Sequence, residues 1–479
     1  MHQYIMELSK YGITGCMVLY TLVSFCGLFV HERIKQGLYI GQCALMFLIQ
    51  LLCFLDLAVV SGDMQYVFFY VFVQVFLLAA AVMVPMIYVE VNRTLLGGLC
   101  MLSGIGLCVI SRLSFDRAVR QYIIVLISLI IALLLPYLLS QVRFLKKITW
   151  VYGLLGVAML GAVLVLSQVT YGSKITFTLG QITFQPSEFV KILFIFFLAG
   201  LFWENATFGK VVLSAIVAGM HVIILVLSRD LGSALIFFVA YVFIVFVATR
   251  NYIYLLLGAA GGVGASYMAY QLFTHIQERV LAWKDPWSYI DNQGYSITQS
   301  LFAIGSGSWF GLGLLQGNPD DIPKVMEDFI FSSICEELGV IFGICVILVT
   351  VCMFLMMLKI SSQIHDRFYQ LIVYGISIMY IFQIFLTIGG GTKLIPLTGV
   401  TLPFISYGGS SVMTTMIMFF LVQGIYIRLQ QVGGKRNGNG TEPGKRNRNR
   451  TEPGKRNGNR TEPGKRESAT KSGKAGEEA

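Results

Sequence analysis

The stretch QYIIVLISLIIALLLPYLLSQ, residues 121–141, contains no charged residue. A helix needs about 20 apolar residues to cross a bilayer, so this stretch predicts a membrane span. Similar apolar runs, thirteen in all, lie at roughly 12–31, 39–60, 65–90, 95–112, 121–141, 149–168, 185–203, 211–228, 231–249, 252–271, 329–358, 368–389 and 409–428. They predict an all-α polytopic membrane protein with about 13 transmembrane helices.

The composition agrees with a membrane protein and excludes a basic soluble fold. The chain has 479 residues, of which 56% are hydrophobic and 13% charged, whereas soluble domains carry about 25% charged residues. Of the net charge of +10, the segment 434–479 holds +7, from 13 Lys and Arg against 6 Asp and Glu. Only +3 is left for the rest of the chain, so no nucleic-acid partner is expected.

The basic C-terminal tail consists of three ten-residue units, GKRNGNGTEP, GKRNRNRTEP and GKRNGNRTEP, which start at residues 434, 444 and 454. These units contain no apolar residue larger than proline, so they cannot bury a core and are predicted to be disordered. The tail is either a solubilising extension or a segment attracted to anionic lipid.

The positions of Lys and Arg in the short loops predict the orientation of the chain. With the tail in the cytoplasm, the loops that fall inside hold Arg33, Lys35, Arg93, Arg143, Lys146, Lys147, Lys210, Arg250, Lys359 and Arg367. The outer loops hold Lys174, Lys393 and a cluster, Arg112, Arg117 and Arg120, that violates the rule. The N-terminus and the long loop 272–328 are then outside the cell.

Ionisable residues within apolar runs are costly and therefore often functional. Glu188 and Lys191 lie at i and i+3 of a helix that Pro186 can start. They form either a self-neutralising pair that helps insertion or a cation directed at an anionic substrate. Asp230 lies in a short connection between two runs, which either only marks a loop or lines a cavity.

A second set of charged residues surrounds the loop 272–328. A loop longer than about 12–15 residues is usually functional or disordered, and the aromatic residues of this one favour order. Asp328 and Glu336 follow it, eight positions apart, which would place them about 80° apart on one helix. They are either carboxylates that face one cavity and bind a cation or a sugar, or an interfacial cluster in water.

Six stretches, in this order, resemble the SEDS family (shape, elongation, division and sporulation), which includes the FtsW, RodA and SpoVE proteins. They are QPSEFVK (185–191), RDLGSALIFF (229–238), GYSITQSLFAIGSGSWFGLGL (294–314), IPKVMEDFIF (322–331), EELGVIFG (336–343) and PLTGVTLPFISYGGSS (396–411). The resemblance implies a ten-span core over 93–430 with its external catalytic loop at 272–328. A three-span extension at 1–92 precedes this core, and the tail 431–479 follows it.

The resemblance also implies an inverting peptidoglycan glycosyltransferase that polymerises lipid II into glycan strands at the outer face of the bacterial cytoplasmic membrane. Its implied partners are a class B penicillin-binding protein, which is a transpeptidase, and other membrane proteins of division or elongation. A divalent cation, Mg or Mn, could share the pyrophosphate charge, and no organic cofactor is expected. The alternatives are a flippase for the lipid-linked precursor and a catalytically silent scaffold for a transpeptidase.

The residues of the expected site come from the same resemblance. The slot of the family's catalytic Asp is Tyr289 here, so the expected catalytic residue is Asp291, with Asp285 second; this departure is what motivates the silent-scaffold alternative. The expected substrate-binding residues are Glu188, Lys191, Asp230, Arg279, Gln299, Asp328, Glu336, Ser406 and Ser410.

Overall fold

The structure is a computed structural model that describes residues 2–30, 32–141, 144–166, 177–179 and 182–438. The chain divides into two compact units, 1–434 and 435–479. Most of the second unit lies outside the described residues, as do Arg143 and Lys174 and the side chains of Arg33 and Lys35. The predicted disorder of the tail therefore stays a prediction.

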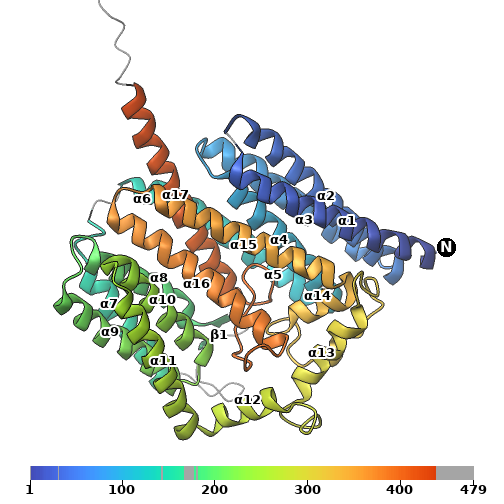
Figure 1. The fold of residues 1–479 in the computed structure, drawn as a ribbon. Coiled ribbons are helices and arrows are strands. Elements are labelled where there is room, and N and C mark those ends of the chain that lie inside the picture. The colour runs from blue at the N-terminus through green and yellow to red at the C-terminus, as the bar shows by residue number, and fades with distance from the viewer. Residues whose placement is uncertain (1, 31, 142–143, 167–176, 180–181, 439–479) are drawn as a thin grey trace, which may run out of the picture. The chain divides into compact units, whose positions relative to one another are not determined.

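The first unit is built from helices, shown in Figure 1. The N-terminal ones are α1 (His2–Phe29), α2 (Glu32–Ser61), α3 (Gln65–Ile87), α4 (Arg93–Leu113), α5 (Phe115–Leu133), α6 (Leu135–Gln141) and α7 (Thr149–Leu166). Two short antiparallel strands, β1 (Phe177–Leu179) and β2 (Ile182–Phe184), precede α8 (Pro186–Phe202), α9 (Phe208–Leu227), α10 (Leu231–Thr249) and α11 (Tyr252–Leu272). The remaining elements are α12 (Thr274–Lys284), α13 (Tyr295–Gly307), η1 (Pro319–Asp321), α14 (Ile330–Leu338), α15 (Val340–Gln363), α16 (Arg367–Gly391) and α17 (Gly409–Gly438).

Twelve candidate spans among the described residues are long and apolar enough to cross a membrane, counting α5 and α6 as one, and this confirms the predicted all-α polytopic membrane fold. The predicted run at 185–203 is α8, a shorter apolar helix of 17 residues. The thirteen predicted runs are thus these twelve spans together with α8.

The predicted run at 329–358 is broken in two at Gly339, which has a φ of +93°. A Cβ added to Gly339 would lie 2.5 Å from the carbonyl oxygen of Trp309, so close backbone packing requires glycine there. The first piece, α14, begins at Ile330 and thus after Asp328. The assumption that Asp328 and Glu336 share one helix is therefore wrong.

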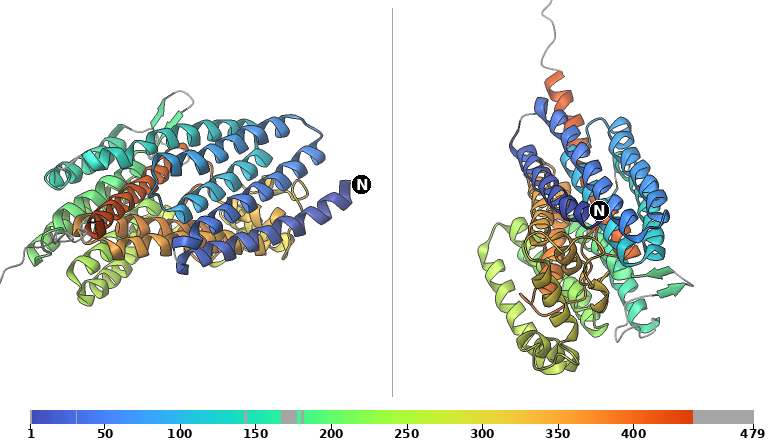
Figure 2. Two further views of the ribbon diagram at one scale, coloured as in Figure 1. Left: turned by 90° about the horizontal axis from the view of Figure 1, so that it is seen from above. Right: turned by 90° about the vertical axis from the view of Figure 1, so that its right-hand side faces the viewer.

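Helix α4 lies in the interior of the unit, and all of its residues from 95 to 111 are buried. The blue helices α1–α3 lie together along one side of the bundle and the green helices α7–α11 along the other (Figures 1 and 2). Small residues let α2 approach α4 closely, since a Cβ on Gly104 would lie 2.6 Å from Nε2 of Gln50 and one on Gly97 would lie 3.3 Å from Oε1 of Gln42. The three N-terminal helices therefore form a closely packed layer over α4.

Candidate functional site

The ion pair predicted in α8 is present and lies in the protein interior. Nζ of Lys191, which is completely buried, donates to Oε1 of Glu188 and to Oε1 of Gln383 on α16, both at 2.9 Å. Among the described residues, Oε2 of Glu188 has no hydrogen-bond partner. In this arrangement the Lys191 charge is neutralised within the helix bundle, and two of its three donors are used there.

Asp230 joins the beginning of α10 to the beginning of α8. One carboxylate oxygen caps α10 by accepting from the backbone N–H of Ser233 at 3.0 Å. The other accepts from Oγ of Ser187 at 3.2 Å, and the side-chain amide of Gln185 donates to it at 3.4 Å. The backbone N–H of Gln185 donates in turn to Oγ of Ser410 at the start of α17. Asp230 thus joins the beginnings of α8 and α10, and Gln185 joins the beginning of α17 to them.

The irregular segment between α16 and α17 lies beside these groups. The Gln383 amide donates to the carbonyl of Thr401 at 2.9 Å, so the segment is tied to the Lys191 pair. Ser406, which is buried, donates to the carbonyl of Glu327 at 2.6 Å and accepts from the N–H of Leu402. The buried backbone of this segment is therefore satisfied by side chains, as irregular backbone at membrane depth requires.

Arg279 of α12, in the loop 272–328, reaches the same segment. Its Nη1 donates to the carbonyl of Leu397 at 3.0 Å. Burial lowers the pKa of the Arg279 guanidinium, and the carboxylates of Asp328 and Asp230 oppose that shift. Burial raises the pKa of Asp328 to about 6, although the cations Lys324 and Arg279 act against it. The charge of Arg279 is therefore opposed by two carboxylates, in an environment that is partly shielded from water.

His275 is one turn before Arg279 on α12. Burial lowers the pKa of its imidazole, and the positive charges of Arg229 and Arg279 add to this effect. Its Nε2 has no hydrogen-bond partner in the described part of the chain. The surroundings of the imidazole therefore disfavour its protonated form.

Seven of the residues expected in the site are linked by these hydrogen bonds, by the Lys191–Glu188 pair or, for Asp328, by its electrostatic interaction with Arg279. We call them the central polar group: Glu188, Lys191, Asp230, Arg279, Asp328, Ser406 and Ser410. Gln299 and Glu336 lie apart from this group, where they line a small cavity between α13 and α14. The structure thus brings together residues from five separate regions of the sequence.

The two aspartates expected to be catalytic lie in the loop 272–328 and are exposed. Asp285 ends α12, where hydrogen bonds from Ser288 hold the pKa of its carboxyl below the usual value. Asp291 lies in a turn that closes with a 2.9 Å hydrogen bond from the N–H of Gly294 to the carbonyl of Tyr289. None of the ion pairs found among the described residues includes either aspartate.

Two residues that stabilise the region around the site were not predicted. Gln383, a polar residue within an apolar run, could have been found by its position alone. Arg112 could not, because its role depends on three contacts with distant segments: 2.7 Å to Glu337, 2.8 Å to Asp320 and 2.9 Å to the carbonyl of Gly317. These contacts neutralise part of the basic cluster that violated the orientation rule.

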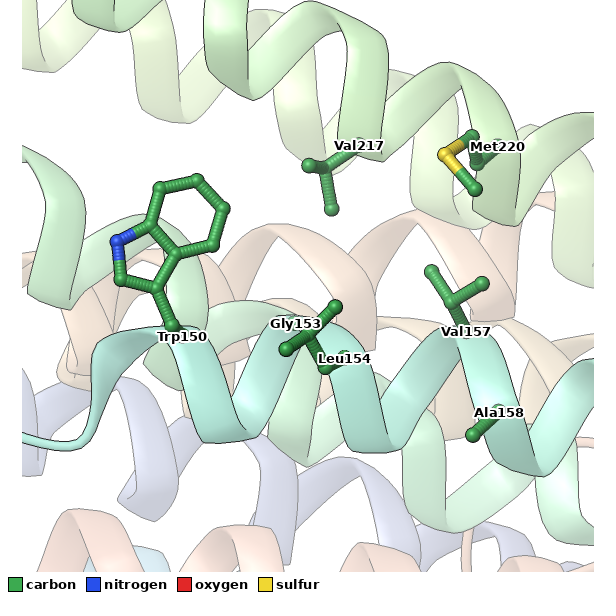
Figure 3. A pocket seen from close by; sticks show the side chains of 7 residues that line it. All are labelled: Trp150, Gly153, Leu154, Val157, Ala158, Val217 and Met220. Atoms are coloured by element: carbon green, nitrogen blue, oxygen red, sulfur yellow. The ribbon is translucent and has the colours of Figure 1, made fainter.

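An apolar groove between α7 and α9 is shown in Figure 3. Its volume is about 190 Å³, and Trp150, Leu154, Val217 and Met220 are among its lining residues. Its walls are aliphatic and aromatic, so it offers no groups for acid–base or phosphate chemistry. The chemistry of the chain is therefore to be sought at the central polar group.

Comparisons with known proteins agree with this arrangement. Residues 95–431 match the model of the FtsW/RodA/SpoVE family, described as cell cycle protein. The peptidoglycan glycosyltransferase RodA of Mycobacterium tuberculosis is 31% identical over 367 residues, which cover 69% of this chain and 77% of that protein. The stage V sporulation protein E of Bacillus subtilis is 33% identical over 262 residues, covering 52% of this chain and 70% of that protein.

Solved structures share the fold. A chain from a peptidoglycan synthase complex that coordinates polymerisation and crosslinking matches with a TM-score of 0.61 at 24% identity, covering 71% of this chain and 99% of that one. The rod shape determining protein RodA of Thermus thermophilus matches with a TM-score of 0.52 at 22% identity, covering 70% and 96%. The three N-terminal helices lie outside the family match. From residue 95 to residue 431, the chain belongs to the FtsW/RodA/SpoVE family.

Proposed function

We propose that the chain is a peptidoglycan glycosyltransferase that polymerises lipid II into glycan strands at the outer face of the bacterial cytoplasmic membrane. Relatives that match over most of their length carry this activity in their names. The observation that carries the proposal is Arg279, which donates to the carbonyl of Leu397 in the irregular segment after α16 and interacts electrostatically with Asp328 and Asp230. A charged group of this kind, beside buried irregular backbone, is what a site for an anionic lipid-linked sugar needs.

The cation for the leaving group is Arg279. The donor sugar departs on a lipid pyrophosphate, and a guanidinium matches phosphate oxygens in a bidentate geometry. Lys191 is the second expected cation, but its ammonium is bound to Glu188. It supports the site by fixing α8 against α16, and it would reach a phosphate only if this pair opened.

The acceptor hydroxyl must lose a proton as it attacks the anomeric carbon, which requires a carboxylate base within hydrogen-bond reach. Asp291 and then Asp285 are the candidates from the family resemblance. Asp328 is a third candidate, because burial raises its pKa to about 6, close to neutral pH, and because it interacts electrostatically with Arg279. Direct displacement by the hydroxyl would invert the anomeric carbon.

The proposed orientation places the N-terminus and the loop 272–328 outside and the basic tail in the cytoplasm. The ion pairs of Arg112 with Glu337 and of Arg117 with Glu327 support it, because they reduce the positive charge that would otherwise oppose translocation. The proposed partners are a class B penicillin-binding protein and other division or elongation membrane proteins. A divalent cation, Mg or Mn, would share the pyrophosphate charge.

Lipid II polymerisation by the purified full-length chain with its transpeptidase partner tests the proposal. The variants are Asp291→Ala, Asp285→Ala and Asp328→Asn, with the exposed Glu278→Gln of α12 as the control. The variant of the true base should lose at least about 100-fold in rate, the usual contribution of general base catalysis, while the control keeps full rate. Polymer formation unchanged in all three variants would refute the assignment of the base.

A silent scaffold is the second candidate function, and Tyr289 in the slot of the family's aspartate is the observation that favours it. In that case the wild-type chain makes no polymer, yet the Asp285/Asp291 double variant complements a deletion strain. A flippase would instead move the lipid II headgroup across liposome membranes without forming polymer. These three outcomes are mutually distinguishable.

A further inference from the structure

A small polar cavity lies between α13, the segment 313–322 and α14. Its volume is about 190 Å³, and its polar lining consists of Gln299, Ser306, Asn318, Asp321 and Glu336. None of these residues belongs to the central polar group. The cavity is therefore a second place on the external side of the protein where charged groups meet.

The carboxylate of Glu336 is only half satisfied. The side chain is buried, with 6% of its surface exposed. Its Oε1 accepts from the backbone N–H of Asn318 at 2.9 Å, but its Oε2 is buried without a hydrogen-bond partner among the described residues. A Cβ on Gly317 would lie 2.9 Å from Cδ of Glu336, so the carboxylate is held in place by the backbone beside it. Such a group requires a partner, because a desolvated carboxylate oxygen left unpaired is strongly unfavourable.

The charge around the cavity is negative. Four carboxylates, those of Glu336, Glu337, Asp320 and Asp321, lie in this neighbourhood and Arg112 accompanies them. The guanidinium of Arg112 is bound to Glu337 and Asp320. It acts on Glu336 electrostatically, but among the described residues it forms no ion pair with either carboxylate that lines the cavity. Lys324, further along the chain, acts on Asp328. The cavity therefore has the negative charge expected of a cation site, and one of the carboxylates that line it has an oxygen without a hydrogen-bond partner among the described residues.

We propose that this cavity binds a hydrated divalent cation of the Mg²⁺ class through Glu336 and Asp321. Mg²⁺ usually keeps several waters and is bound through one or two carboxylates, so it does not need the cluster of three acidic, His or Cys ligands that is absent from the described residues. The cavity volume of about 190 Å³ is several times the ~30 Å³ that one water molecule occupies, so the cavity has room for an ion and some of its waters. The side-chain oxygens of Asn318 and Gln299 can bind those waters.

The ion would link α14 to the segment that follows α13. Oε2 of Glu336 belongs to the helix and Asp321 to η1, so bound cation would tie the external segment to the bundle. This site is independent of the proposed transferase activity and of any cation at the pyrophosphate.

Mn²⁺ binding followed by electron paramagnetic resonance tests the inference. The full-length chain, in nanodiscs of neutral phosphatidylcholine, is titrated with Mn²⁺ in the absence of lipid II, and Mg²⁺ is then added as competitor. The wild type should show one saturable site that Mg²⁺ displaces. Glu336→Gln and Asp321→Asn should each weaken binding by at least about tenfold, the lower limit for loss of a metal-site residue. The exposed Glu278→Gln of α12 should bind as the wild type does.

Two results would overturn the inference: no saturable Mn²⁺ binding by the wild type up to about 1 mM, the weak end of extracellular cation sites, or binding that either variant retains in full. The first result would mean that Glu336 is protonated instead. Each variant is first checked by size exclusion, and if Glu336→Gln fails to fold, the exposed Asp321→Asn decides alone. Because no lipid II is present, failure of this inference is distinguishable from failure of the proposed activity.

Discussion

Replacing Arg112 by Met should destabilise the protein mainly through Glu337. The two side chains are 7% and 2% exposed, and Nε and Oε1 are 2.7 Å apart. Removing one partner of a buried ion pair costs about 3–5 kcal/mol, because the other charge is left without compensation. The second ion pair of Arg112, with Asp320, adds little, because Asp320 is 61% exposed and such pairs contribute about 0–1 kcal/mol.

The protonation of Glu337 sets the expected magnitude. Burial raises the pKa of Glu337 to about 7 even with Arg112 present. Without the guanidinium, the carboxyl will take up a proton near neutral pH and avoid part of the penalty. We therefore expect a loss of about 3 kcal/mol, the low end of the range for a broken buried pair.

A double-mutant cycle in mixed SDS and detergent micelles measures this effect. The free energy of unfolding is compared for the wild type, Arg112→Met, Glu337→Gln and the double variant, with Asp320→Asn as a matched control for the exposed pair. The double variant should be more stable than the sum of the single losses predicts, and the control should lose at most about 1 kcal/mol. A loss below about 1 kcal/mol in Arg112→Met, or additive single effects, would refute the reasoning.

Three further predictions concern other parts of the structure. Lys191→Met alone should lower the free energy of unfolding by about 3 kcal/mol, because it leaves Glu188 buried and unpaired, and Lys191→Met with Glu188→Gln should recover most of that loss in the same assay. Gly339→Ala should lower stability by at least about 1–3 kcal/mol through its positive φ and close backbone contact, whereas the exposed Gly261→Ala of α11 should not. Burial raises the pKa of Asp328 in the folded state to about 6, against an ordinary value of 3.8. Between these pH values the folded state binds more protons than the unfolded state, so the free energy of unfolding should fall as the pH rises from 4 to 6. The Asp328→Asn variant should show a weaker pH dependence in the same assay.

The spans were predictable because the bilayer imposes a minimum apolar length that the sequence shows directly. The break at Gly339 was not, because it depends on the approach of the Trp309 carbonyl, which lies in another segment. For the same reason our prediction that Asp328 shares a helix with Glu336 was wrong, since α14 begins only at Ile330. The length of an apolar run can be read from the sequence, but a break within the run depends on the segments that pack against it in the fold.

The central polar group was predictable in part. Glu188, Lys191 and Asp230 stand out because charge within an apolar run is costly. Arg112 was identified only as an exception to the orientation rule, since its acidic partners are more than 200 positions away in the sequence. Asp285 and Asp291 remain predictions from family resemblance, and the exposed turn on which they lie gives no contact that selects one of them.

Because α1–α3 cover α4, this helix has no lipid boundary to satisfy, and glycines such as Gly97 and Gly104 can replace the bulky side chains that contact acyl chains. A truncated protein that began at residue 93 would present a grooved, poorly filled surface to the bilayer. We expect that neither lipid nor a second copy of the protein would fill the spaces over Gly97 and Gly104 as well as α2 does. A minimal version of this protein therefore has to keep its first three helices, and any companion helix in the membrane has to approach from another side.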